Sequence, residues 1–138
     1  MTEQNDLADL SATPLTCPKC GGTMEKIPVE QYQVDRCDHC KGLFFDAITH
    51  ERLMDLPGGE AIDTGAKHEE NRDEVVRIKC PECHAPMIRM VDHNKPHIWY
   101  ESCPVCFGIY MDAGEFREQK DRTVVSFVRE RFHHQERW

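Results

Sequence analysis

The stretch that decides the fold is Cys17-Pro-Lys-Cys20-Gly-Gly-Thr-Met24, and a close copy, Cys80-Pro-Glu-Cys83-His-Ala-Pro-Met87, follows 63 residues later. Each turn has a partner further along the chain, Cys37-Asp-His-Cys40 for the first and Cys103-Pro-Val-Cys106 for the second. Two Cys-x-x-Cys turns joined by a hairpin can place four sulfur atoms around one tetrahedral metal ion. The spacing therefore predicts two metal sites, with the ligands Cys17, Cys20, Cys37 and Cys40 in one and Cys80, Cys83, Cys103 and Cys106 in the other.

The residues around the cysteines repeat as well. Gly42-Leu-Phe-Phe-Asp-Ala47 recurs as Gly108-Ile-Tyr-Met-Asp-Ala113, at a shift of 66 residues. In each copy, alternating apolar residues predict two hairpin strands between the Cys-x-x-Cys turns, and a third apolar strand leads into an aspartate that can cap a helix. The expected strands are 24–29, 32–34 and 43–45 in the first copy and 87–91, 98–100 and 109–111 in the second.

These patterns predict a small, metal-stabilised α+β fold of two tandem modules, each a β-hairpin with a short third strand and a helix. Pro57-Gly58-Gly59 should end the first helix near Leu56. The second helix is expected to run from Ala113 almost to the C-terminus, because Val124, Val125, Val128 and Phe132 share one helical face. The expected organisation is a disordered tail at 1–14, a first module at 15–57, a linker at 58–77 and a second module with the C-terminal helix at 78–138.

The composition limits the classes of protein to which this chain can belong and the roles its cysteines can have. No apolar run approaches the 18 or more residues of a membrane-spanning helix, and the first ten residues do not resemble a secretory signal. We therefore expect a cytoplasmic protein, in which eight cysteines bind metal rather than form four disulfides. Each site should be structural and closed, with one Zn²⁺ per copy contributing on the order of 10 kcal/mol to folding. Spacing alone does not distinguish zinc from iron.

The first copy resembles the transcription-factor-IIB-type zinc-finger family of small prokaryotic proteins. The likeness lies in Cys17 to Met24 and in Val34-Asp-Arg-Cys37-Asp-His-Cys40-Lys-Gly-Leu-Phe-Phe-Asp46. The second copy shares it through Cys80-Pro-Glu-Cys83, Cys103 to Gly108 and Asp112-Ala-Gly-Glu-Phe116. The resemblance implies two zinc ribbons with all eight cysteines as ligands, and it implies little about activity. Two departures are Ile48-Thr49 in place of the family's Gly-Glu, and His84-Ala85 in place of Gly-Gly.

Three classes of function follow from these residues. The favoured one is a protein-binding or regulatory adaptor, with transcription as one setting, whose contacts come from exposed aromatic residues such as Tyr32, Trp99 and Tyr100. Its partner would be a protein, and a homodimer through the C-terminal helix is a further expectation. Nucleic-acid binding is an alternative with less support, because the net charge is −8 and neither hairpin carries a basic stripe.

The remaining alternatives are a redox protein and an enzyme. The pattern from Cys37 to Gly42 is similar to rubredoxin knuckles and to thiol–disulfide proteins, but no neighbouring residue predicts a lowered thiol pKa. We expect no enzymatic activity: Asp46, His50 and Glu51 lack an accompanying nucleophile and suit a helix start better. His39 and His84 lie beside knuckles that already have four sulfurs, so surface positions are expected for both.

Overall fold

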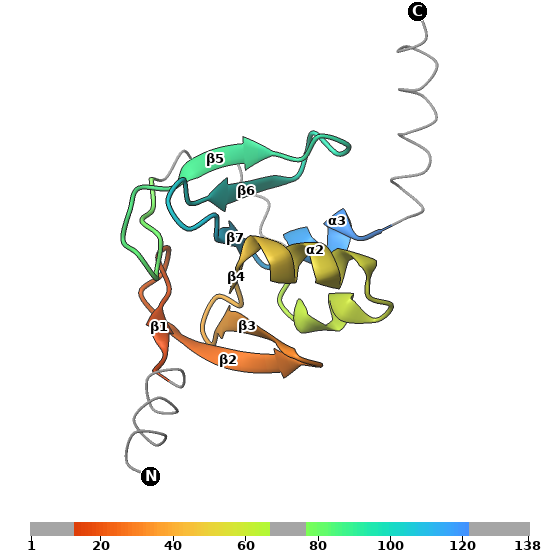
Figure 1. Ribbon diagram of the computed structural model, residues 1–138, viewed down its shortest axis with the longest axis horizontal. Coiled ribbons are helices and arrows are strands. Elements are labelled where there is room, and N and C mark those ends of the chain that lie inside the picture. The colour runs from red at the N-terminus through yellow and green to blue at the C-terminus, as the bar shows by residue number, and fades with distance from the viewer. Residues whose placement is uncertain (1–12, 67–76, 122–138) are drawn as a thin grey trace, which may run out of the picture.

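The computed structural model describes residues 13–66 and 77–121, which form one antiparallel sheet with helices against it (Figure 1). The first copy contributes four strands, and the second contributes three. The elements are β1 (Leu15–Thr16), β2 (Thr23–Val29), β3 (Tyr32–Cys37), β4 (Leu43–Phe45), α2 (Ala47–Asp55), the 3₁₀ helix η1 (Gly59–Ile62), β5 (Ile88–Val91), β6 (Trp99–Ser102), β7 (Ile109–Met111) and α3 (Glu115–Gln119).

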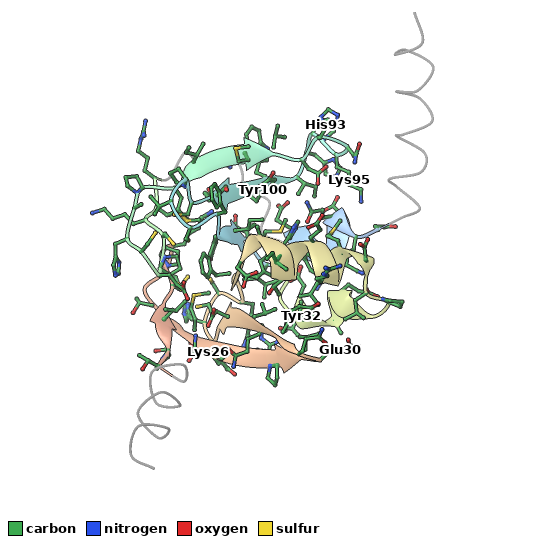
Figure 2. All side chains as sticks on the ribbon, viewed as in Figure 1. Lys26, Glu30, Tyr32, His93, Lys95 and Tyr100 are labelled. Carbon is green, nitrogen blue, oxygen red and sulfur yellow. The ribbon has the colours of Figure 1, made fainter. Side chains whose placement is uncertain are left out.

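The α+β fold and the two hairpins agree with the sequence prediction. β2 pairs with β3 and β5 with β6, and each third strand pairs with the returning strand of its own hairpin. The turn between β5 and β6, where Figure 2 labels His93 and Lys95, is closed by Asp92. Its carboxylate accepts from the backbone amides of Asn94 at 2.7 Å and Lys95 at 3.0 Å, as expected for an aspartate that begins a turn.

The two copies are joined edge to edge. β4 of the first copy pairs antiparallel with β7 of the second, which gives one seven-stranded sheet in the order β1-β2-β3-β4-β7-β6-β5. Phe44 lies opposite Tyr110, its counterpart in the repeat, so the pairing places equivalent residues across a pseudo-two-fold axis. The sequence predicted the strands but not this contact between them.

The two faces of the central strands carry different cores. Alternate residues of a strand point to opposite faces, so Phe44 and Tyr110 face one side while Leu43 and Phe45 face the other. The first face holds both cysteine groups together with Met24, Phe44, Ile78, Met87 and Tyr110. The second face packs against the helices through Val34, Leu43, Phe45, Leu53, Ile62, Ile98, Met111 and Phe116.

Helix α2 confirms the predicted first helix. Asp46 is its N-cap, since the Asp46 carboxylate accepts from the backbone amide of Thr49 at 2.8 Å. The backbone carbonyl groups at the C-terminal end of α2 find their hydrogen-bond donor in the other copy. Lys120 Nζ donates to the carbonyl oxygens of Leu53, Met54 and Leu56 at 2.8–3.2 Å. A cation is favoured at a helix C-terminus. Because this cation belongs to the second copy and the helix to the first, the contact stabilises the two copies against each other.

Helix α3 departs from the prediction at its start. It begins at Glu115, because the preceding Gly114 has a φ of 86°, which lies outside helical geometry. The side chain of Asp112 does not cap this helix. The Asp112 carboxylate instead accepts from Lys19 Nζ of the first copy at 2.9 Å. The capping role falls to Asp63, which accepts from the backbone amides of Gly114 and Arg117, both at 2.8 Å.

Part of the stretch expected to be a linker is packed. Residues 58–66 include η1, and the side chains of Ile62 and Asp63 are buried against the second copy. The tail at 1–12, the stretch 67–76 and the predicted continuation of the C-terminal helix through Val124–Phe132 lie outside the described residues. Among the described residues, no helix combines the length and apolar character required to cross a bilayer.

Asp63 provides a test of this packing. In Asp63→Ala, two amides at the start of α3 lose their acceptor in a buried setting, so we expect the free energy of unfolding to fall by about 2 kcal/mol. Urea denaturation of the metal-saturated protein measures this. Asp55→Ala is the matched control at an exposed position and should change stability by less than about 0.5 kcal/mol. Equal effects of the two substitutions would contradict the capping role.

Candidate metal centre

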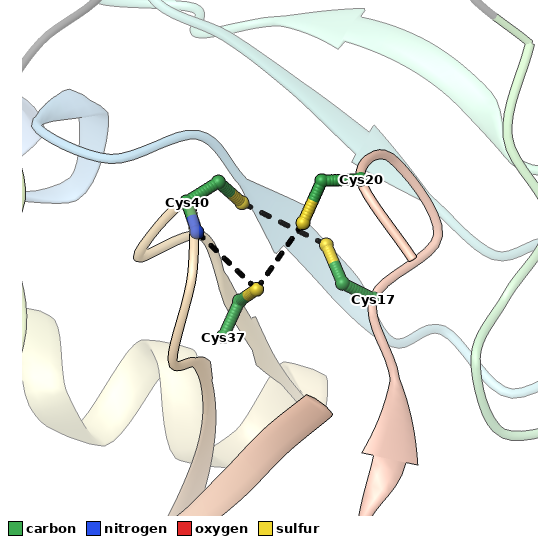
Figure 3. Close-up of side chains that lie close together, drawn as sticks. All are labelled: Cys17, Cys20, Cys37 and Cys40. Carbon is green, nitrogen blue, oxygen red and sulfur yellow. Dashed lines mark hydrogen bonds between the residues drawn. The ribbon is translucent and has the colours of Figure 1, made fainter. Parts of the chain in front are cut away.

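The four cysteines of the first copy converge on one point (Figure 3). Two come from the turn after β1 and two from the turn after β3. The Sγ atoms of Cys17 and Cys40 are 3.7 Å apart, and those of Cys20 and Cys37 are 3.4 Å apart. All four Sγ atoms lie within 4.8 Å of one another, so they form a compact cluster, here called the first cluster.

The second copy builds the same arrangement, here called the second cluster. The Sγ atoms of Cys80 and Cys106 are 3.6 Å apart, and those of Cys83 and Cys103 are 3.2 Å apart. These four atoms also lie within 4.8 Å of one another. The structure thus brings together every cysteine that the sequence predicted as a ligand, in the predicted grouping.

The spacing of the sulfurs fits a tetrahedral metal ion. Four thiolates about 2.3 Å from a central ion lie about 3.8 Å from one another, close to the separations observed. A disulfide would need the sulfurs about 2.05 Å apart, and all eight cysteines are free. Each cluster can therefore hold one metal ion with four protein ligands, which leaves no open position for a substrate.

The backbone of each turn supports its sulfurs. The amides of His39 and Cys40 donate to Cys37 Sγ at 3.3 and 3.4 Å, and the equivalent amides of Val105 and Cys106 donate to Cys103 Sγ at 3.4 Å. Such hydrogen bonds stabilise thiolate charge. The residue after the second cysteine of every turn has a positive φ, and these residues are Gly21, Lys41, His84 and Phe107.

An aromatic ring from each copy covers the cluster of the other. Tyr110 lies against Gly42 beside Cys40, and Phe44 lies against Gly108 beside Cys106. A Cβ at Gly42 would lie 2.7 Å from Tyr110 Cζ, and one at Gly108 would lie 2.5 Å from Phe44 Cζ, so only glycine admits the rings. The Tyr110 hydroxyl oxygen lies 3.4 Å from Cys17 Sγ and 3.6 Å from Cys40 Sγ.

These contacts change the thiol chemistry that the sequence predicted. The Cys40 thiol and then the Tyr110 hydroxyl act on Cys17, and its pKa falls to about 4 although burial opposes the shift. The proton of the pair stays on Cys40, whose pKa is raised, first by Cys17. The residues next to the knuckles did not suggest a lowered thiol pKa, because the two groups that act on Cys17 lie 23 and 93 residues away in the sequence. A thiolate favoured at Cys17 suits metal binding.

The other residues singled out in the sequence are not members of either cluster. His39 and His84 are exposed and belong to neither cluster, as expected. The ring of His50 packs against Phe45 and Phe116 at centroid distances of 5.2 and 5.8 Å. Its Nε2 lies 2.9 Å from Gln119 Oε1, and burial lowers the pKa of the ring.

A groove between the copies holds residues that sequence reasoning missed. Phe107 follows the last knuckle and is 63% exposed, and Ile48 at the start of α2 is 65% exposed. They line a groove of about 480 Å³ together with Tyr32, Cys106 and the Asp46 N-cap. Of the aromatic residues predicted as contacts, Tyr32 reaches this groove. Trp99 is exposed but does not line the groove, and the Arg89 guanidinium lies 4.8 Å from its ring centroid. A bulky apolar residue between Cys106 and Gly108 was the available signal.

The shared sheet makes the two clusters depend on each other. In Cys83→Ala the second cluster loses a ligand, and its copy should lose the free energy that metal binding contributes. Because β4 pairs with β7, we expect faster hydrogen exchange in β3 and β4 of the first copy as well. Exchange followed by mass spectrometry in excess Zn²⁺ measures this, with Glu82→Ala as the control in the same turn. Faster exchange confined to residues 80–111 would contradict the coupling.

Comparison with known proteins agrees with this geometry. Residues 16–56 match the family model described as transcription factor zinc-finger. No curated protein and no solved structure matches the chain. The matched segment contains the whole first cluster, and the second cluster repeats its two Cys-x-x-Cys turns and their local backbone, with three more residues between the turns. Residues 16–56 are therefore similar to the zinc ribbon of the transcription factor zinc-finger family, and the second four-cysteine cluster at 80–106 fits a second copy.

Proposed function

We propose that the protein is a zinc-stabilised, protein-binding adaptor of regulatory type, with one Zn²⁺ in each cluster. Four thiolates at tetrahedral spacing suit a closed structural zinc site, and such a site supplies folding free energy rather than catalysis. Metal analysis of a fresh preparation should give two equivalents of zinc per chain. Two equivalents of iron, with the visible colour of iron–thiolate sites, would favour the rubredoxin-like alternative instead.

The observation that carries the binding role is the exposed side chain of Phe107. A bulky residue with φ near 64° is strained, and such strain costs on the order of 1–3 kcal/mol. Glycine would occupy the same position without strain, as Gly21 does in the first knuckle. An exposed aromatic residue kept in an unfavourable conformation therefore supports a role in contact with another molecule.

The surroundings of Phe107 favour a protein partner. Phe107 and Ile48 come from different copies, so their relative position is fixed by the shared sheet and by both metal sites. The groove between them also presents polar groups from Tyr32, Gln33 and Thr49. Apolar anchors with a polar surround are typical of sites that bind a protein segment.

Nucleic-acid binding finds less support in the charges. In the first hairpin, Lys26 Nζ lies 2.8 Å from the Asp35 carboxylate, so this cation is already paired. Lys19 is similarly engaged by Asp112 at 2.9 Å. Polyanion binding relies on cations that can neutralise phosphates, and the net charge of the chain is −8.

Phe107→Gly tests the proposal in a way that separates binding from folding. Relief of the backbone strain should raise the free energy of unfolding by about 1 kcal/mol, whereas the loss of the ring should abolish partner contact. A photo-crosslinking amino acid in place of Ile48 reports that contact in cells. His84→Gly is the matched control, because it relieves the same kind of strain away from the groove.

The crosslinked products decide the outcome. We expect a defined protein adduct in the parent chain and in His84→Gly, and its loss in Phe107→Gly. Unchanged adducts in Phe107→Gly would contradict the assignment of the groove as the binding surface. Adducts that disappear on nuclease treatment would favour the nucleic-acid alternative over a protein partner.

A further inference from the structure

We propose that the two metal sites are unequal, and that Tyr110 causes the difference. Its hydroxyl makes the first cluster the site that releases its ion slowly, while the second cluster, where Phe44 stands in the equivalent position, is the exchangeable site. This inference rests on the proposed binding of one zinc ion by each cluster.

The inequality arises at the pseudo-two-fold axis. Phe44 and Tyr110 are equivalent in the repeat, pair across β4 and β7, and approach the opposite copy in the same way. Their Cζ atoms lie 2.5 and 2.7 Å from the Cβ positions of Gly108 and Gly42, so the two rings are placed alike. The difference is the single oxygen on Tyr110, which lies within 3.4 and 3.6 Å of two ligand sulfurs.

A hydrogen bond to a metal-bound thiolate makes the sulfur harder to displace. The hydroxyl donates its hydrogen bond to a lone pair of the sulfur, which a competing proton or an alkylating reagent would otherwise attack. Groups that support metal ligands in this way commonly change metal affinity roughly 10- to 100-fold when removed. Because Tyr110 touches Cys17 and Cys40 together, it acts on one ligand from each turn of the first cluster.

Exposure and charge act in the same direction. Cys40, beneath Tyr110, is half-buried, whereas its counterpart Cys106 is exposed. Four thiolates and a divalent ion carry a net charge of about −2, so a neighbouring cation stabilises the cluster. The first turn of the first copy contains Lys19, and the corresponding position in the second copy is Glu82.

The exchangeable ion would lie beneath the proposed partner surface. Cys106, a ligand of the second cluster, lines the groove and immediately precedes Phe107. Loss of the ion would release the turn that holds Phe107 in its strained conformation. Occupancy of the second cluster would thereby control presentation of the adaptor surface.

The experiment measures release of zinc from the full chain to a chromophoric chelator. The parent protein should release two equivalents in two phases that differ at least tenfold in rate. Iodoacetamide alkylation with mass spectrometry, sampled after the fast phase, assigns the sites, and Cys83 and Cys106 should be modified first. In high salt the difference should narrow, because charge effects are screened, but it should persist through the hydroxyl.

Two reciprocal substitutions separate the effect of the hydroxyl group on zinc release from that of the aromatic ring. Tyr110→Phe keeps the ring and should accelerate the slow phase roughly 10- to 100-fold without changing the fast one. Phe44→Tyr supplies a hydroxyl on the opposite side and should slow the fast phase. The double substitution should exchange the order in which the two sets of cysteines are alkylated, which a general loss of stability cannot do.

Cobalt gives a second readout that depends on the sulfurs themselves. In Co²⁺-loaded protein, loss of the hydroxyl hydrogen bond in Tyr110→Phe should shift thiolate-to-cobalt charge-transfer absorption to lower energy, because the sulfurs become better electron donors. Two ions released at one rate, or an unchanged slow phase in Tyr110→Phe, would overturn the inference and leave the zinc sites standing. Fewer than two ions bound at the start would instead overturn the proposed metal binding.

Discussion

The pairing of β4 with β7 is the interaction on which the rest of the structure depends. It turns two hairpins, each too small to enclose a core, into one seven-stranded sheet. It also carries Phe44 and Tyr110 across the boundary, so that each copy supplies the aromatic cover of the other copy's cysteine cluster. Metal binding by either cluster would therefore be coupled to formation of the sheet, because each copy supplies a strand neighbour and a covering ring to its partner.

The two faces of the sheet divide the work of stabilisation. On one face, the sulfurs and the two aromatic rings form a core to which a metal ion in each cluster would contribute much of the free energy. On the other face, α2, η1 and α3 bury aliphatic and aromatic side chains in the usual way. Polar contacts cross between copies on this side: Lys120 reaches the end of α2, and Asp63 reaches the start of α3. The helices thus hold together the two copies, each of which contains one cysteine cluster.

The sequence was informative where the physics is local. Cys-x-x-Cys turns, alternating strands and the Asp46 cap depend on residues a few positions apart, and the structure has them where they were predicted. The β4–β7 pairing depends on two strand edges separated by more than 60 residues, and no pattern within either copy specifies it. Asp112 illustrates the limit. Its position predicted a helix cap by analogy with Asp46, but a lysine from the other copy engages it, and a buried aspartate from the expected linker takes over the cap.

A duplicated module fused through its own edge is free to become asymmetric. In a symmetric dimer, one tyrosine at the axis would affect both clusters equally, because each copy would carry it. Within a single chain, position 44 and position 110 can differ, as can position 19 and position 82. The result is one cluster with the Tyr110 hydroxyl and Lys19, and another with Phe44 and Glu82 at the equivalent positions and with an exposed ligand beside Phe107. Duplication supplies the fold, and divergence at its axis supplies two sites of different character.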